Sequence, residues 1–119
     1  MNSSQSGNST FCEEEIQNLV ALIGRDEVRE MVEKFFSLAK QDLAKSDVAL
    51  AHNDREAVKK CAHRIAGAAL SLSFSGVALL AQKIEGSSRL SKADLDDLSM
   101  ALVLTRSAVE EWITTKGLG

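Results

Sequence analysis

The chain has 119 residues, a length that predicts one domain with a buried core. Its formal net charge of -3 argues against a nucleic-acid partner and against contact with an anionic membrane surface. No apolar run reaches the roughly 20 residues that cross a bilayer. The two cysteines have no metal-ligand spacing, so reduced thiols in a cytoplasmic protein are expected, with a single disulfide between two chains as the alternative.

The composition favours helices throughout. The sequence has no proline, so no helix interior is interrupted by a missing N–H, and alanine and leucine are abundant. Residues 1–9 are polar and rich in serine, and they bury too little apolar surface to offset the entropy of ordering. We therefore expect a flexible tail or linker at residues 1–9 and one helical domain at residues 10–119.

The first two helices are predicted from their ends. A capping-box pattern places Thr10 at the start of the first helix and Glu13 at its N3 position. Gly24 is expected to end this helix as its C′ residue, the first position beyond the C-cap. The second helix begins near Asp26, and its apolar spacing continues to about Leu50.

Three more helices follow. A second capping-box match starts the third helix at Asn53, and the helix runs to about Ser73. The fourth covers residues 75–85 and stops at Gly86. Ser91 caps the fifth, whose inward seam is Leu95, Leu98, Leu102, Thr105, Val109 and Trp112. Short connections between these helices predict an all-α fold, an antiparallel four-helix bundle with an additional N-terminal helix.

The third helix carries a histidine outside its apolar face. That face consists of Val58, Ala62, Ile65, Ala69 and Leu72. At about 100° per residue, these five positions lie within about 40° of their centre line, whereas His63 lies near 140°. The pattern therefore predicts that His63 faces solvent or the edge of a groove, and not the core.

The neighbours of His63 suggest an anion site. Gly67 lies in mid-helix, where glycine costs about 1 kcal/mol relative to alanine, and it leaves room one turn from the imidazole. Lys59 and Lys60 add positive charge on the preceding turn. A doubly negative group could bind an imidazole nitrogen here. The alternative is a surface histidine between solubilising lysines, with Gly67 tolerated by chance or by tight helix packing.

A resemblance to a known family rests on the segment AHRIAGAALSLSFSGVALLAQKIE, residues 62–85. It is similar to the signature of histidine-containing phosphotransfer (HPt) domains, which reads Ala-His-x-Leu-Lys-Gly-Ser/Ala-Ser/Ala, followed by a second helix ending in Leu-Glu or Ile-Gln. The matching residues are Ala62, His63, Ile65, Gly67, Ala68, Ala69, Ile84 and Glu85. The turns at residues 23–27 and 49–54 also resemble the turns of that family.

The resemblance implies roles for individual residues. His63 would be the phosphorylated residue, and Glu85 would accept a hydrogen bond from Nδ1–H, leaving Nε2 as the nucleophile. Gln82, one turn earlier, is the second candidate for that role. Gly67 would provide steric room.

Two positions differ from the family pattern. Ala66 stands where the family usually has lysine or arginine, and Ser73 stands where glycine is common. Lys59 and Lys60, or less favourably Arg64, would then balance the phosphoryl charge. Ala66 and Leu70 are uncharged neighbours of His63, and they are expected to contact either a docked partner or a neighbouring helix.

The resemblance implies a phosphocarrier that relays a phosphoryl group between receiver-domain aspartates through His63. It would not be an enzyme, since the partner receiver completes the chemistry. Its partners would be response-regulator receiver domains, a hybrid sensor histidine kinase, or both, and the domain would act as a monomer. No cofactor or metal of its own is expected, and Mg²⁺ would belong to the receiver.

Two other functions compete with this one. The same bundle could be a docking scaffold that binds a receiver or kinase without transfer, a possibility suggested by Ala66. A helical-bundle enzyme or metal carrier is the third hypothesis, but the sequence lacks the clustered Glu and His ligands that bundle metal sites require.

Overall fold

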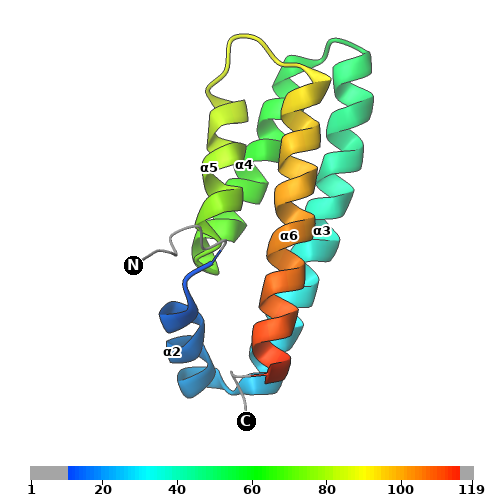
Figure 1. Cartoon of the computed structure of the whole chain (residues 1–119). Helices are drawn as coiled ribbons and strands as arrows, with labels where there is room; N and C mark the ends of the chain where they lie inside the picture. Colours follow the sequence, from blue (N-terminus) through cyan, green and yellow to red (C-terminus); the bar gives the residue numbers. More distant parts are fainter. Residues whose placement is uncertain (1–10, 116–119) are drawn as a thin grey trace.

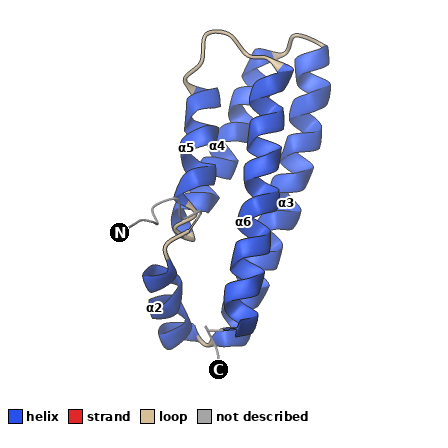
Figure 2. Cartoon of the chain, in the orientation of Figure 1, coloured by secondary structure: helices blue, strands red, loops and turns tan. Residues whose placement is uncertain are grey.

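The structure is a computed structural model that describes residues 11–115. The expected tail at residues 1–9 and the expected cap Thr10 lie outside the described residues. Over residues 11–115 the chain is all-helical (Figure 2). The helices are α2 (Glu13–Ile23), α3 (Arg25–Ala51), α4 (Arg55–Ser71), α5 (Ser75–Glu85) and α6 (Lys92–Thr115).

Four of the helices form the predicted antiparallel bundle. Helix α3 packs against α4 and α6, and α5 packs against the same two helices, so the four surround one core (Figure 1). The additional helix α2 packs on α3 at one end of the bundle. None of the helices in the described part of the chain is both long enough and apolar enough to span a membrane.

The bundle core follows the predicted helix faces. Every residue of the predicted α6 seam is buried, as is the whole predicted apolar face of α4. The largest fully buried side chain is Phe74, at the start of α5. Its ring lies 5.2 Å from that of Phe35, 5.6 Å from Phe36 and 6.5 Å from Phe11, measured between centroids. This aromatic cluster joins the start of α5 to α3 and to the segment before α2.

Several predicted helix ends are confirmed. Gly24 ends α2 with φ +94°, a left-handed conformation that glycine adopts without strain. Helix α5 covers residues 75–85, as predicted. Before α6, the Ser91 N–H donates to Asp94 Oδ2 at 3.1 Å, and the Asp94 N–H lies 3.4 Å from Ser91 Oγ. This is the reciprocal pattern of a capping box.

Two predicted caps differ from the structure. The first described helix begins at Glu13 after Cys12, which makes no side-chain cap, so Glu13 is the first residue of the helix and not its N3 position. Asp54, and not Asn53, caps α4, because Asp54 Oδ1 accepts from the Ala57 N–H at 3.2 Å. Asn53 instead turns the chain with φ +60°.

The turn between α4 and α5 contains a second left-handed residue. Ser73 has φ +61°, a conformation that costs a residue with a side chain roughly 1–2 kcal/mol. Glycine adopts it freely. This backbone requirement explains why glycine suits the position that Ser73 fills here.

Candidate functional site

His63 projects from the exposed side of α4. Its side chain is 74% exposed, whereas Ala62 and Ile65 beside it are buried. The prediction that His63 lies off the core face is therefore confirmed. An exposed imidazole without a burial role is free to react with a group that approaches from solvent.

One carboxylate orients the imidazole. Glu85, the last residue of α5, places Oε2 2.7 Å from His63 Nδ1. An ionised carboxylate can only accept, so Nδ1 carries the hydrogen, and in a neutral ring Nε2 then keeps its lone pair. The contact comes from Glu85 and not from Gln82, which lies exposed one turn earlier.

Positive charge gathers beside the imidazole. The residues that line an open hollow of about 410 Å³ are Glu56, Lys59, Lys60, His63, Arg64 and Glu85. Within residues 11–115, Lys59 and Lys60 form no ion pair. Their charges therefore remain available to an anion that enters this hollow.

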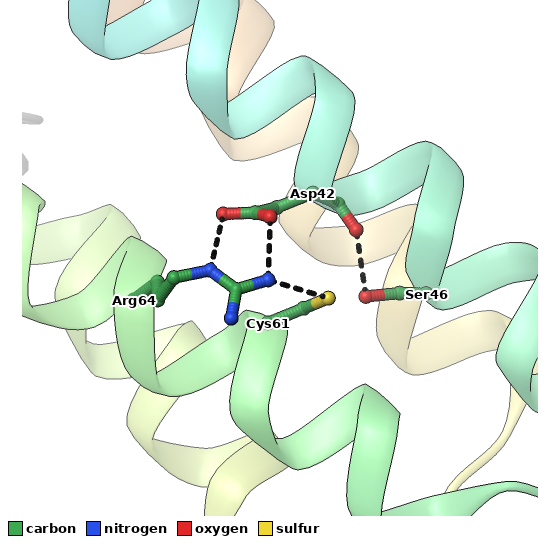
Figure 3. Close-up of polar contacts among 4 residues, drawn as sticks. All are labelled: Asp42, Ser46, Cys61 and Arg64. Carbon is green, nitrogen blue, oxygen red and sulfur yellow. Dashed lines mark hydrogen bonds and ion pairs between the residues drawn. The ribbon is translucent and has the colours of Figure 1, made fainter.

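Arg64 lines the same hollow, but its guanidinium is directed towards α3. Its guanidinium donates to both oxygens of Asp42 on α3, with Nη2 at 2.8 Å and Nε at 3.3 Å, and Nη2 also lies 3.3 Å from Cys61 Sγ (Figure 3). The hydrogen bond to Asp42, with the attraction of its charge, raises the pKa of Arg64. The sequence suggested Arg64 as a further cation for the phosphoryl group, but the structure directs its guanidinium to Asp42.

Asp42 is a residue of this region that was not predicted from the sequence, although the sequence contains a signal for it. The buried positions of α3 recur at spacings of three and four, and Asp42 and Ser46 occupy two of them. A carboxylate at a core-facing position requires a partner, because burying an unpaired charge is costly. The partner could not be identified from spacing within one helix, since Arg64 lies on the neighbouring helix.

Gly67 leaves open space beside His63. A Cβ built at Gly67 would meet nothing within 4 Å, and the residue is exposed. Tight helix packing therefore does not explain this glycine. The room that the sequence suggested above the imidazole is present.

Because the space at Gly67 is open, the effect of a larger side chain on stability can be separated from its effect on reaction rate. Gly67→Ala should stabilise the fold by about 0.5–1 kcal/mol, since it removes a helix-interior glycine without a clash. The resemblance implies that a phosphorylated protein partner reacts with His63. The bulkier Gly67→Gln should stay folded but slow such a reaction by about tenfold or more, because reacting groups misplaced by even an ångström lose rate steeply. Urea unfolding measures the first effect and a labelling time course measures the second. Phosphoramidate, a small phosphoryl donor, is the control, and an equal slowing with it would contradict steric exclusion of a protein.

The structure corrects the expectation for Ala66. This residue is 4% exposed and belongs to the core, so it cannot line a docking surface. Ala66 lies about 80° from Val58 around the helix, on the flank of α4 that carries His63, and α5 covers that flank. The alternative, packing against a neighbouring helix, is therefore right. Leu70 differs, since 54% of its surface is exposed on the same side of α4 as His63.

Within the described part of the chain, neither the other histidine nor the remaining acidic and thiol side chains form a second site. His52 lies exposed after α3, where its Nδ1–H donates to the Val48 carbonyl at 2.9 Å. Among residues 11–115, no three His, Cys, Asp or Glu side chains gather closely enough to hold a metal ion.

Comparison with known proteins produced one match. The family model described as Hpt domain matches residues 30–114, which extend from the second turn of α3 to the last turn of α6. Neither the search of curated proteins nor the search of solved structures found a match.

Proposed function

The chain belongs to the Hpt domain family, and on that premise we propose that His63 accepts a phosphoryl group from a receiver-domain aspartate and passes it to another receiver. Hpt domains are phosphocarriers of two-component phosphorelays that interact with receiver domains and kinases. The observation that carries the proposal for this chain is the 2.7 Å contact between His63 Nδ1 and Glu85 Oε2 beside an exposed ring.

The reaction uses the lone pair of His63 Nε2. Nε2 attacks the phosphorus of the aspartyl phosphate, the P–Nε2 bond forms, and the bond from phosphorus to the aspartate oxygen breaks, so the aspartate leaves as a carboxylate. The imidazole keeps its Nδ1 hydrogen and becomes positively charged. The Glu85 carboxylate stabilises that charge as it develops. Transfer to the next receiver reverses these bond changes.

The surroundings of His63 suit this transfer. Lys59 and Lys60 border the hollow and attract the incoming phosphoryl charge. Gly67 and the exposed Leu70 leave an uncharged surface on which a receiver can approach. The receiver would supply the Mg²⁺, since phosphoryl transfer depends mainly on positioning and charge stabilisation and this chain provides the oriented nucleophile.

The proposal is tested with a panel of phosphorylated receiver domains in the presence of Mg²⁺. The chain is expected to gain a label that is lost in acid and stable in alkali, the behaviour of a phosphorylated histidine. A second receiver added afterwards should remove the label. If no receiver labels the chain while binding is still detectable, transfer is wrong and the docking scaffold becomes the better description.

Glu85 provides a graded test of the mechanism. Glu85→Ala should slow labelling by about tenfold, since a hydrogen bond to a charged group contributes about 1.5–3 kcal/mol and this one is partly exposed. Glu85→Gln should retain more activity, because its amide oxygen can still accept from Nδ1–H. Single-turnover labelling by one phosphorylated receiver measures both rates. Equal rates in all three proteins would contradict the orienting role, and Gln82→Ala is the matched control on α5.

A further inference from the structure

Arg64 lies next to the proposed phosphoryl site but is engaged elsewhere. It follows His63 directly and lines the same hollow. Arginine binds phosphate more strongly than lysine does, because its planar guanidinium donates two parallel hydrogen bonds. Here that two-pronged donor is already used by Asp42, at 2.8 and 3.3 Å. The Arg64 guanidinium, the strongest phosphate ligand near His63, is therefore already bound to the Asp42 carboxylate.

Asp42 has a physical reason to retain Arg64. Its side chain is only 12% exposed, while the side chain of Arg64 is 53% exposed. Among the residues that the structure describes, Arg64 is the one cation paired with the Asp42 carboxylate. If Arg64 turned towards His63, it would leave a largely buried carboxylate without a partner, which is strongly unfavourable.

We propose that Asp42 is a positioning residue that holds the Arg64 guanidinium away from the phosphoryl group on His63. Lys59 and Lys60 then remain as the balancing cations in the hollow. Without a guanidinium clamp, the phosphoryl group is held less firmly and passes more readily to the next receiver. This inference rests on the proposed function, since it concerns the phosphorylated form of His63.

The test uses chemical phosphorylation, so it needs no receiver. Phosphoramidate transfers its phosphoryl group to Nε2 as its P–N bond breaks, a P–Nε2 bond forms and ammonia leaves. All proteins carry His52→Gln, which leaves His63 as the one histidine to be labelled. Two quantities are measured by NMR. One is the ³¹P titration midpoint of the phosphoryl group, and the other is the Nε–H signal of Arg64 before and after phosphorylation.

The expected results distinguish release of Arg64 by Asp42 from the mere loss of a negative charge on α3. In the native background, the Arg64 Nε–H signal should keep its hydrogen-bonded position after phosphorylation. Asp42→Asn should release Arg64 and lower the titration midpoint by about 0.2 to 0.7 pH units, the size expected when one exposed ion pair forms. The charge-preserving double variant Asp42→Asn/Arg64→Gln should match the native midpoint. Asp47→Asn, which removes an equal charge from α3, should leave the midpoint unchanged.

Three results would overturn the inference. One is a native Arg64 signal that moves away from its hydrogen-bonded position on phosphorylation. Another is a higher midpoint in the double variant, which would mean that Arg64 already serves the phosphoryl group. The third is an Asp42→Asn midpoint equal to the native one. The first measurement needs no Asp42 variant, so it decides the question even if Asp42→Asn fails to fold. Failure of the receiver panel would contradict the proposed function without altering these readouts.

Discussion

Replacement of His63 by glutamine is expected to lower labelling by phosphorylated receivers more than about a hundredfold, because it removes the nucleophile itself. Glutamine has a similar reach but carries an amide nitrogen whose lone pair is delocalised, so it cannot attack phosphorus. The side chain of His63 is 74% exposed, and the substitution should therefore change the free energy of unfolding by no more than about 0.5 kcal/mol. Labelling and urea unfolding, measured on the same preparation, separate loss of chemistry from loss of fold.

His52→Gln is the matched control for this experiment. His52 is the other histidine of the chain, and it is also exposed. It contacts the Val48 carbonyl, whereas His63 contacts a carboxylate. His52→Gln should keep native labelling. Label that survives in His63→Gln but disappears in His52→Gln would move the phosphorylated residue to the turn after α3 and contradict the proposed function.

Phe74→Ala is expected to cause the largest loss of stability, about 3–5 kcal/mol. Phe74 is fully buried, and its ring contacts those of Phe11, Phe35 and Phe36. Truncation leaves a cavity at the start of α5 and removes three aromatic contacts, each worth about 0.5–1.5 kcal/mol. Since domains are stable by only about 5–15 kcal/mol, this variant should be close to unfolding at room temperature.

Urea unfolding followed by circular dichroism measures the Phe74 effect, and Trp112 fluorescence reports separately on the other end of the cluster. The Trp112 ring lies 6.2 Å from Phe11, so both probes should show the same shift. Leu79→Ala is the control on the same helix, because Leu79 is 66% exposed and its truncation should cost less than about 1 kcal/mol. A loss below about 1 kcal/mol for Phe74→Ala would show that the cluster can repack around the missing ring.

Features with local causes were predicted well. The bounds of α5 and the Ser91–Asp94 capping box depend on residues within one turn of each other, and both are confirmed. The direction of His63 follows from its angle to the apolar face of its own helix. The cap at Asp54 shows the limit of this reasoning. Asn53 and Asp54 are both residues that cap helices well. Asn53 adopts the left-handed conformation of the turn, so Asp54 is the residue that caps α4.

The helices, their inward faces and the exposure of His63 can be predicted from the sequence, because these depend on periodicity and on residues close together in the chain. Burial of the side chains on the flanks of α4 depends instead on how the helices pack. Ala66 is buried and Leu70 is exposed, although both lie on the side that faces α5, because α5 covers one of them and not the other.

Two side-chain contacts that join α4 to its neighbouring helices have the same origin. His63 and Glu85, like Asp42 and Arg64, are each separated by 22 positions in the chain. The resemblance suggested the first contact, but its 2.7 Å geometry requires the antiparallel register of α4 and α5. For the second, the sequence signals only a core-facing carboxylate at Asp42, and the contact exists because α3 brings that carboxylate within reach of Arg64 on α4. Side-chain pairing between helices is a property of their packing, and a single-helix pattern contains no information about it.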